Sequence, residues 1–204
     1  MNYLLPLFIG YVAAFVGLLA PSMLNMTAAR TSIEKGRKCG ILFAAGAASV
    51  VFIQGFIAVT FAKYLVANPD VITQLKTAAI FVLLVLSVFF FIQARKTFNA
   101  AGRKKDGKSF SIGFGLSSLN MLAIPFYLAM ATLAESKGWM SIEKPVSLIF
   151  VLGAVLGAFS IFSVYAIFAE IIAKKAAFIA KNINYILSGL FIVLAVITTF
   201  QVFG

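Results

Sequence analysis

The sequence Gly17-Leu-Leu-Ala-Pro-Ser-Met-Leu-Asn25 decides how this chain is built, because an uncharged run that starts at Leu4 here meets a proline and then polar side chains. Proline lacks a backbone N–H and its ring clashes with the preceding turn, so a helix from Leu4 must kink or end near Pro21. Within a bilayer such a break is tolerated only where it is buried in protein or lines a wet cavity. This stretch is therefore the first place to look for the path of a solute.

A related break recurs in the second half of the chain, in Ser117-Ser-Leu-Asn-Met-Leu-Ala-Ile-Pro125. Similar tripeptides precede the two breaks, Ile9-Gly-Tyr11 and Ile112-Gly-Phe114, and the same tetrapeptide comes after them, Ser32-Ile-Glu-Lys35 and Ser141-Ile-Glu-Lys144. Each match is short, but their shared order indicates an internal repeat.

The composition is that of a membrane protein. The 204 residues are 62% apolar and 11% charged, whereas soluble domains are about 45–50% apolar and about 25% charged. The net charge of +11 could indicate nucleic-acid binding, but the basic residues lie in short segments between apolar runs, so we expect no nucleic-acid partner. One cysteine and no histidine leave no disulfide framework and no soft-metal site, and we expect no metal and no cofactor.

Six apolar runs are long enough, or nearly so, to cross a bilayer, which takes about 20 helical residues. They are 4–19, 39–66, 77–92, 109–133, 146–172 and 183–203. The predicted fold is therefore all-α, a polytopic membrane protein with six transmembrane helices in the lipid bilayer.

Positive charge alternates along the linkers between these runs. The linkers 28–38, 93–108 and 173–182 hold four, six and three Lys or Arg residues and at most one acid each, whereas 67–76 and 134–144 are balanced. The positive-inside rule places the three basic linkers in the cytoplasm, which predicts a multi-pass protein of the cytoplasmic (inner) membrane with both termini outside.

Each half has three spans. Because three is an odd number, the second half enters the membrane from the side opposite to the first. This predicts two inverted three-helix repeats, 1–98 and 109–204, joined by a basic cytoplasmic linker at 99–108.

Transporters with inverted repeats place their site near the midplane, where broken helices turn their ends toward the solute. Free N–H groups at a helix start bind a carboxylate and carbonyl groups at a helix end bind an ammonium group, which fits an amino acid. A purely structural interpretation stays open, in which the prolines only kink the helices and the amides form hydrogen bonds between helices. The candidate substrate-binding residues, including one amide in the middle of the second span, are Pro21, Ser22, Asn25, Gln54, Ser117, Ser118, Asn120 and Pro125.

Small residues form a stripe at helical spacing in the first run, namely Gly10, Ala14, Gly17 and Pro21. The fifth run carries a second small-residue pair in Gly153-Ala-Val-Leu-Gly157. Both patterns are typical of close helix packing in membranes, and we expect packing rather than substrate contact there.

Among the acids, Glu135 and Glu170 lie nearest to membrane depth and are the candidates for an ionisable coupling group. A solvated helix end is the alternative for each. No Gly-x4-Gly-Lys-Ser/Thr loop is present, so any energy comes from gradients or from another subunit. Without histidine, paired intramembrane carboxylates or a nucleophile–base pair, we expect no enzyme.

Residues 8–48, with a glycine-bearing first helix, a proline break, Ala28-Ala-Arg-Thr-Ser-Ile-Glu-Lys-Gly-Arg-Lys38 and a small-residue second helix, resemble the opening of the lysine-exporter family, often written LysE/RhtB. Residues 110–127 resemble that family's fourth helix, and the basic central linker fits as well. Members are six-helix inner-membrane proteins, so the resemblance implies a secondary transporter that exports amino acids or related small metabolites.

The chain departs from the family pattern at both breaks. The family usually carries Pro-Gly-Pro and then asparagine in the first break and Asn-Pro in the second, whereas this chain has Pro21-Ser-Met-Leu-Asn25 and Ile124-Pro125. The two prolines match the family pattern, and Asn25 and Asn120 match it with a shift in spacing.

The predicted function is therefore the export of amino acids or related small zwitterionic metabolites by alternating access. Two alternatives stay open: a structural or assembly subunit, which needs no polar cavity, and an exporter of a different small solute or ion. The sequence also leaves open whether the chain forms a homo-oligomer.

Overall fold

The computed structural model describes residues 3–68, 108–120 and 122–172, together with 84–85, 87–88, 91–92, 185, 188–190, 192–193, 195–197 and 199–200. All regular structure in these residues is helical, which confirms the predicted all-α class. The chain divides into two units, one of Met1–Tyr64 with Ala100–Lys174 and the other of Leu65–Asn99 with Lys175–Gly204. The first unit contains both helix breaks.

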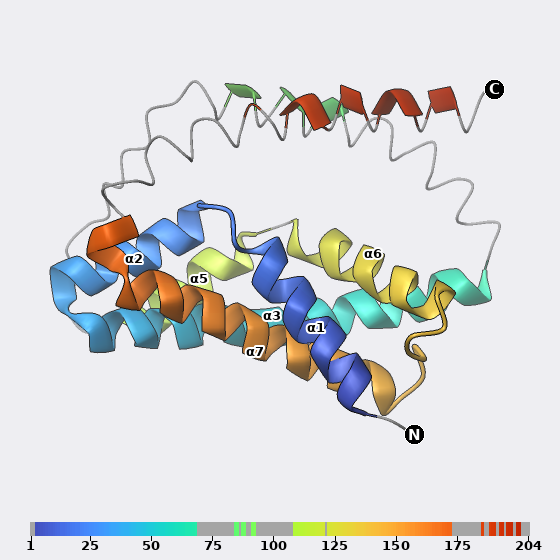
Figure 1. The fold of residues 1–204 in the computed structure, drawn as a ribbon, viewed down its shortest axis with the longest axis horizontal. Coiled ribbons are helices and arrows are strands. Elements are labelled where there is room, and N and C mark those ends of the chain that lie inside the picture. Colours follow the sequence, from blue (N-terminus) through green and yellow to red (C-terminus); the bar gives the residue numbers. More distant parts are fainter. Residues whose placement is uncertain are drawn as a thin grey trace. The chain divides into compact units, whose positions relative to one another are not determined.

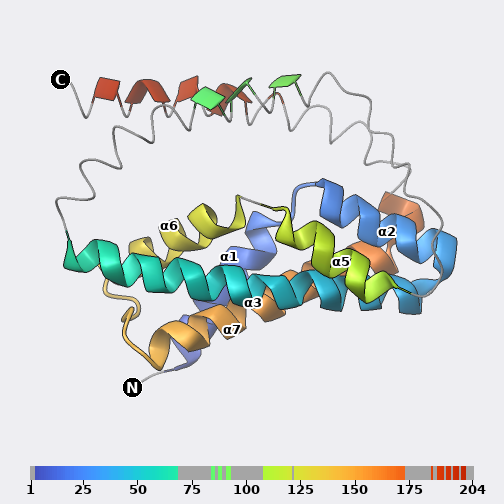
Figure 2. The same cartoon turned by 180° about the vertical axis from the view of Figure 1, so that it is seen from behind.

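The order short helix, short helix, long helix occurs twice along the described chain (Figure 1). It is formed first by α1 (Leu4–Gly17), α2 (Met23–Lys35) and α3 (Arg37–Ala67), and again by α5 (Ser109–Ser118), α6 (Ala123–Ser136) and α7 (Val146–Ile167). We call residues 18–22 the first break and residues 119–122 the second break. In both views α1 lies against α7 and α5 against α3, so each broken pair packs on the long helix of the other half (Figures 1 and 2).

Glycines let the backbones of α1 and α7 touch. A methyl group added at Gly10 would overlap the carbonyl oxygen of Phe150, and one added at Gly153 would overlap the carbonyl oxygen of Leu7. Small residues permit this close approach in membrane helices, where dispersion rather than water exclusion drives packing. The expectation of close packing is therefore confirmed for Gly10 and Gly153, and we call this contact the first seam.

The contact between α3 and α5, the second seam, repeats the same arrangement. A methyl group at Gly113 would overlap the carbonyl oxygen of Phe43, and one at Gly46 would overlap that of Phe110. The spacings within each helix also agree between the seams. The matched residues, first seam and then second, are Gly10 with Gly113, Phe150 with Phe43, Gly153 with Gly46, and Leu7 with Phe110.

Two of the described helices, Arg37–Leu65 within α3 and Val146–Ile167, are long and apolar enough to cross a membrane. The pair α5 and α6, bent by 69°, counts as a third if it is taken as one span. α1 is apolar but shorter. The predicted runs 77–92 and 183–203 lie largely outside the described residues, and their described positions are helical.

The predicted linker 28–38 is helical over most of its length, because α2 continues to Lys35. Its charged residues sit on a regular helix, where Arg30 and Glu34 pair one turn apart at 2.6 Å. The chain reverses at Gly36, whose φ of +87° is a conformation that side chains with a Cβ rarely adopt. The charged residues alone had indicated a linker here, but long charged side chains at a helix end can also reach the membrane–water interface.

The second break lies three residues earlier than Pro125. Chain positions 119–122 separate α5 from α6, and Pro125 is the third residue of α6. In the first turn of a helix the missing proline N–H costs nothing, because that group has no partner within the helix. The run 109–133, predicted to be interrupted at Pro125, is thus two helices, and the proline lies in the first turn of the second rather than at the end of the first.

In the second unit, two serines from distant parts of the chain bond reciprocally. The Ser188 hydroxyl donates to the carbonyl oxygen of Ser87 at 3.0 Å, and the Ser87 hydroxyl lies 3.1 Å from the carbonyl oxygen of Ser188. Phe91 and Tyr185 meet edge to face nearby, with centroids 6.1 Å apart. Hydrogen bonds of this kind join helices inside membranes.

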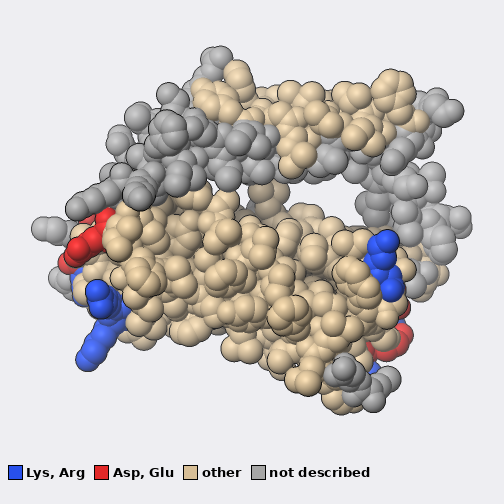
Figure 3. Space-filling model, viewed as in Figure 1, with Lys and Arg blue, Asp and Glu red and all other residues tan. Residues whose placement is uncertain are grey.

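Charged side chains gather at the two ends of the first unit on the face drawn in Figure 3, and the surface between them carries none. The α2–α3 turn carries Arg30, Glu34 and Lys35 at one end, and Lys63, Glu143 and Lys144 lie at the other. An uncharged band between two charged rims is the surface expected of a protein in a bilayer.

Candidate functional site

The first break is held by side chains from α2 and α7. Asn25, in the first turn of α2, is fully buried, and its Nδ2 donates to the carbonyl oxygens of Leu18 at 2.6 Å and Ala20 at 2.8 Å. The Tyr165 hydroxyl of α7 donates to the carbonyl oxygen of Leu19 at 2.8 Å. Three successive carbonyl groups that α1 leaves free thus have donors, which is how an irregular backbone survives at membrane depth.

The second break is held by one side chain of α3. Gln54 is buried, and its Nε2 donates to the carbonyl oxygens of Ser117 at 3.1 Å and Asn120 at 3.2 Å. The interhelical hydrogen bond that the sequence left open for Gln54 is therefore present, and it ends on the backbone of the break rather than on another side chain.

The amide oxygens of Asn25 and Gln54 have no donor. Each NH2 group faces two carbonyl oxygens, so the amide cannot be flipped without placing oxygen against oxygen. Within the described part of the chain, the buried side-chain N and O atoms without a partner are Asn25 Oδ1, Gln54 Oε1 and Ser163 Oγ. A buried acceptor without a donor costs about 1–3 kcal/mol, so these oxygens call for a water or a ligand.

Ser22 caps the start of α2. Its side-chain oxygen accepts from the Asn25 N–H at 3.4 Å, and its backbone is extended as expected of an N-cap residue. Pro21 is half-buried and lies in the break just before this cap. The first turn of α2 leaves backbone N–H groups without partners inside the helix, and these can face an anion.

Gly17 and Phe126 bring the two breaks together. Gly17 is the last residue of α1, and Phe126 lies in the first turn of α6. A methyl group added at Gly17 would overlap Phe126 Cζ and lie 3.0 Å from both Cε atoms, so the tip of the ring rests on the glycine. The polar ends of the two broken pairs therefore meet around one aromatic ring.

The other residues predicted at the second break take part differently. Ser118 is exposed, and its hydroxyl donates to the Phe114 carbonyl oxygen of its own helix at 2.9 Å. Asn120, which is half-buried, contributes its backbone carbonyl group to the bond with Gln54. Pro125 is exposed in the first turn of α6.

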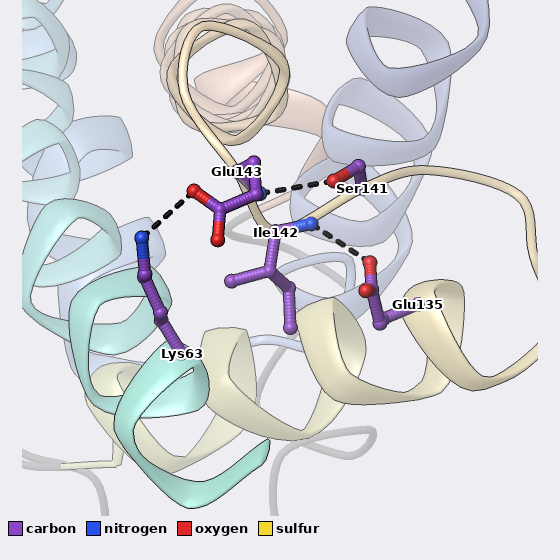
Figure 4. A network of polar contacts seen from close by, with 5 residues as sticks. All are labelled: Lys63, Glu135, Ser141, Ile142 and Glu143. Atoms are coloured by element: carbon purple, nitrogen blue, oxygen red, sulfur yellow. Dashed lines mark hydrogen bonds and ion pairs between the residues drawn. The ribbon is translucent and has the colours of Figure 1, made fainter. Parts of the chain in front are cut away.

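The two acids named as coupling candidates make no hydrogen bond to either break among the bonds of the described residues. Glu135 accepts a hydrogen bond from the Ile142 N–H at 2.7 Å and so ties the end of α6 to the loop before α7 (Figure 4). Beside it Glu143 pairs with Lys63 of α3 at 2.7 Å. Glu170 is exposed near the end of the α7 region. No group of three or more His, Cys, Asp or Glu side chains that could hold a metal occurs among the described residues.

Sequence reasoning missed two residues of this site. A lone tyrosine hydroxyl in the apolar run 146–172 should have indicated Tyr165, because a buried hydroxyl usually finds a partner. Phe126 gave no such signal, since its contact with Gly17 joins residues that are distant in sequence.

The family model of the LysE type translocators matches residues 15–200. The chain belongs to this family. The match spans both breaks and most of both halves, and it confirms the resemblance seen in the sequence. A LysE type translocator is a membrane transporter rather than an enzyme, so the chain is an integral membrane protein that carries a small molecule through the lipid bilayer. No curated protein and no solved structure gives a significant match.

Proposed function

We propose that this LysE type translocator exports small amino acids or related zwitterionic metabolites across the cytoplasmic membrane by alternating access. The observation that supports the proposal is the meeting of two uncharged helix breaks, each with a buried amide oxygen that lacks a donor. The solute site lies between these breaks.

A zwitterion would complete the bonding of the first break. Its ammonium group donates to Asn25 Oδ1, and its carboxylate lies against the first turn of α2, where free N–H groups and the helix dipole favour negative charge. Gln54 Oε1 offers a second acceptor from the other half of the chain. Neutral acceptors bind an ammonium group without holding it as tightly as a carboxylate would, which suits a site that must also release its solute.

Six spans in two inverted repeats, 1–98 and 109–204 around the linker 99–108, are the architecture we propose for the whole chain. The two seams support it, because the same four-residue contact joins the first helix of each half to the long helix of the other. The proposed orientation places both termini outside, and reporters fused after Gly102 and after Gly204 should then lie on opposite sides of the membrane.

The seams also indicate which parts move together. Because the backbones touch along each seam and bury it closely, we expect α1 to move with α7 and α5 to move with α3. Between these pairs the close contacts are made by side chains: a methyl group added at Gly55 of α3 would lie 3.1 and 3.4 Å from the Val151 methyl groups, and one added at Gly40 would lie 2.9 Å from Ala166 Cβ. Rocking of one pair against the other would open the site alternately to either side.

The main competitor is a structural or assembly subunit. One observation favours this reading: the NH2 groups of Asn25 and Gln54 donate to backbone carbonyl oxygens, as amides with a purely structural role would. Substitution of Asn25 by leucine separates the readings: a transporter loses transport beyond its loss of folded protein, whereas a structural subunit has no transport to lose.

The decisive experiment is efflux of labelled amino acids from vesicles that contain the purified protein, with and without a pH gradient. We expect saturable efflux of at least one zwitterion, and dependence on the gradient would point to an ionisable coupling group. Glu135 is engaged with a backbone N–H, so Glu170→Gln is the first variant to test for that coupling. Efflux no faster than from protein-free vesicles across the panel would overturn the proposal.

A further inference from the structure

Phe126, in the first turn of α6 after the second break, contacts Gly17, the last residue of α1 before the first break. Its ring tip meets the Cα side of Gly17, so no side chain larger than hydrogen fits at position 17 while the ring stays. The neighbouring Tyr127 is 1% exposed, and its ring meets the Phe126 ring edge to face with centroids 5.2 Å apart, so one side of the Phe126 ring packs on a buried residue. Phe126 itself is half-buried.

The chain segments on either side of this contact contain no charged residue. Neither 17–25 nor 117–126 contains a Lys, Arg, Asp or Glu residue. A solute with a charged side chain would lose its hydration here and gain no opposite charge, which is costly in a medium of low polarity. A solute with an uncharged side chain does not have this cost in desolvation free energy.

From this geometry we propose that Phe126 is a specificity-determining residue, whose ring on Gly17 closes the way between the breaks and limits the side chain of the solute to a small, uncharged one. The inference rests on the proposed function, because it assumes that the solute passes between the breaks. The ring must leave Gly17 for the solute to pass, and the room that the displaced ring vacates sets the largest side chain that can cross.

Two substitutions act on this contact in opposite directions. Phe126→Ala removes the ring and enlarges the passage, whereas Gly17→Ala pushes a methyl group into the ring tip. The chain offers matched controls on α5: Gly115→Ala, where an added methyl group would meet nothing within 4 Å, and Phe114→Ala, which removes an exposed ring.

The experiment measures efflux of labelled alanine, leucine, phenylalanine and lysine from vesicles containing each variant. Phe126→Ala should raise the ratio of phenylalanine to alanine flux about tenfold or more, since a size filter discriminates by roughly 10- to 200-fold per methylene-sized step. Gly17→Ala should lower that ratio, and both α5 controls should leave it within about twofold. Phe126→Leu, which keeps an apolar side chain, should fall between wild type and Phe126→Ala.

The outcomes separate the role of Phe126 as a size filter from the proposed transport. If wild type transports alanine and Phe126→Ala keeps the wild-type ratio of phenylalanine to alanine flux, the filter is refuted while the proposed function stands. If wild type exports lysine as fast as alanine, the restriction to uncharged side chains fails, and again transport survives. If wild type moves none of the four solutes, the filter falls together with the proposed transport of amino acids. Should Phe126→Ala not fold, Phe126→Leu and Gly17→Ala still test the inference through the same ratio.

Discussion

The two helix breaks of the first unit share their backbone packing but not their polar side chains. Both seams use glycine against a carbonyl oxygen at matched positions. The carbonyl groups of the first break accept from the side chains of Asn25 and Tyr165. At the second break the carbonyl groups of Ser117 and Asn120 accept from the Gln54 side chain and also from the backbone N–H groups of Asn120 and Ala123.

This difference shows which positions of the structure tolerate substitution. A backbone contact depends on the absence of a side chain, so only glycine serves there and both halves retain it. A freed carbonyl group accepts from any donor that reaches it, so the two halves reach the same result with different residues. We therefore expect matched substitutions in the two seams to lower stability equally, and substitutions of the side chains that hold the two breaks to lower it unequally.

The largest effect is expected at the seams. Gly10→Ala and Gly113→Ala each force a methyl group into a backbone carbonyl oxygen and should destabilise by about 3 kcal/mol, the upper end for overpacking. Gly115→Ala, with open space around it, should instead stabilise by about 0.5–1 kcal/mol through helix propensity. Thermal unfolding of the purified variants in detergent measures all three, and a Gly10→Ala variant as stable as Gly115→Ala would disprove the seam.

The next effect compares the amides. Asn25→Leu leaves two carbonyl oxygens unpaired in a fully buried place and should cost about 1–3 kcal/mol. Gln54→Leu should cost less, because its bonds are longer, at 3.1 and 3.2 Å. Unfolding midpoints of both single variants and the double variant give the comparison, and a greater loss for Gln54→Leu would reverse the ranking of the breaks.

A smaller effect is expected for Tyr165→Phe, which removes one hydrogen bond to Leu19 and leaves the ring in place. Such bonds inside membranes average about 0.6 kcal/mol and reach about 1.7 kcal/mol. Tyr11→Phe is the matched control, since the Tyr11 ring stacks on Phe15 at 5.9 Å and needs no hydroxyl for that contact. Equal stabilities of the two variants would mean that the first break does not depend on α7.

The smallest effect compares the two Ser-Ile-Glu-Lys segments. Glu143, in the loop before α7, pairs with Lys63 of α3, while Glu34 pairs with Arg30 within α2. Both pairs are exposed, so Glu143→Gln and Glu34→Gln should each cost below about 1 kcal/mol and lose even that in high salt. A large, salt-independent loss for Glu143→Gln would show that this pair holds the α6–α7 loop on α3.

Much of the fold could be predicted from elementary patterns in the sequence. Apolar runs predicted α3 and α7 almost to their ends, and Pro21 marked the first break correctly, because proline excludes itself from a helix interior. The second break was placed late, since Pro125 can occupy a first turn as well as end a helix. The charges of the predicted linker 28–38 did not reveal that α2 continues as a helix to Lys35, because helix ends also carry charge.

The site was only partly accessible from the sequence. Asn25 and Gln54 were named as candidates because a polar amide in an apolar run must find partners. That their partners are the backbone carbonyl groups of the two breaks required the packing of α2 and α3, since Gln54 and Ser117 are 63 positions apart. The role of Phe126 depends on such a distant contact as well.

By itself the sequence determined the membrane as solvent, the helical class, the family and the existence of two uncharged breaks, because each of these depends on local composition and backbone chemistry. The tertiary structure alone decided that α1 packs on α7 and α5 on α3, that two amide oxygens are left without donors, and that one ring lies between the breaks. These features depend on which distant surfaces meet at close range, and no local pattern specifies that.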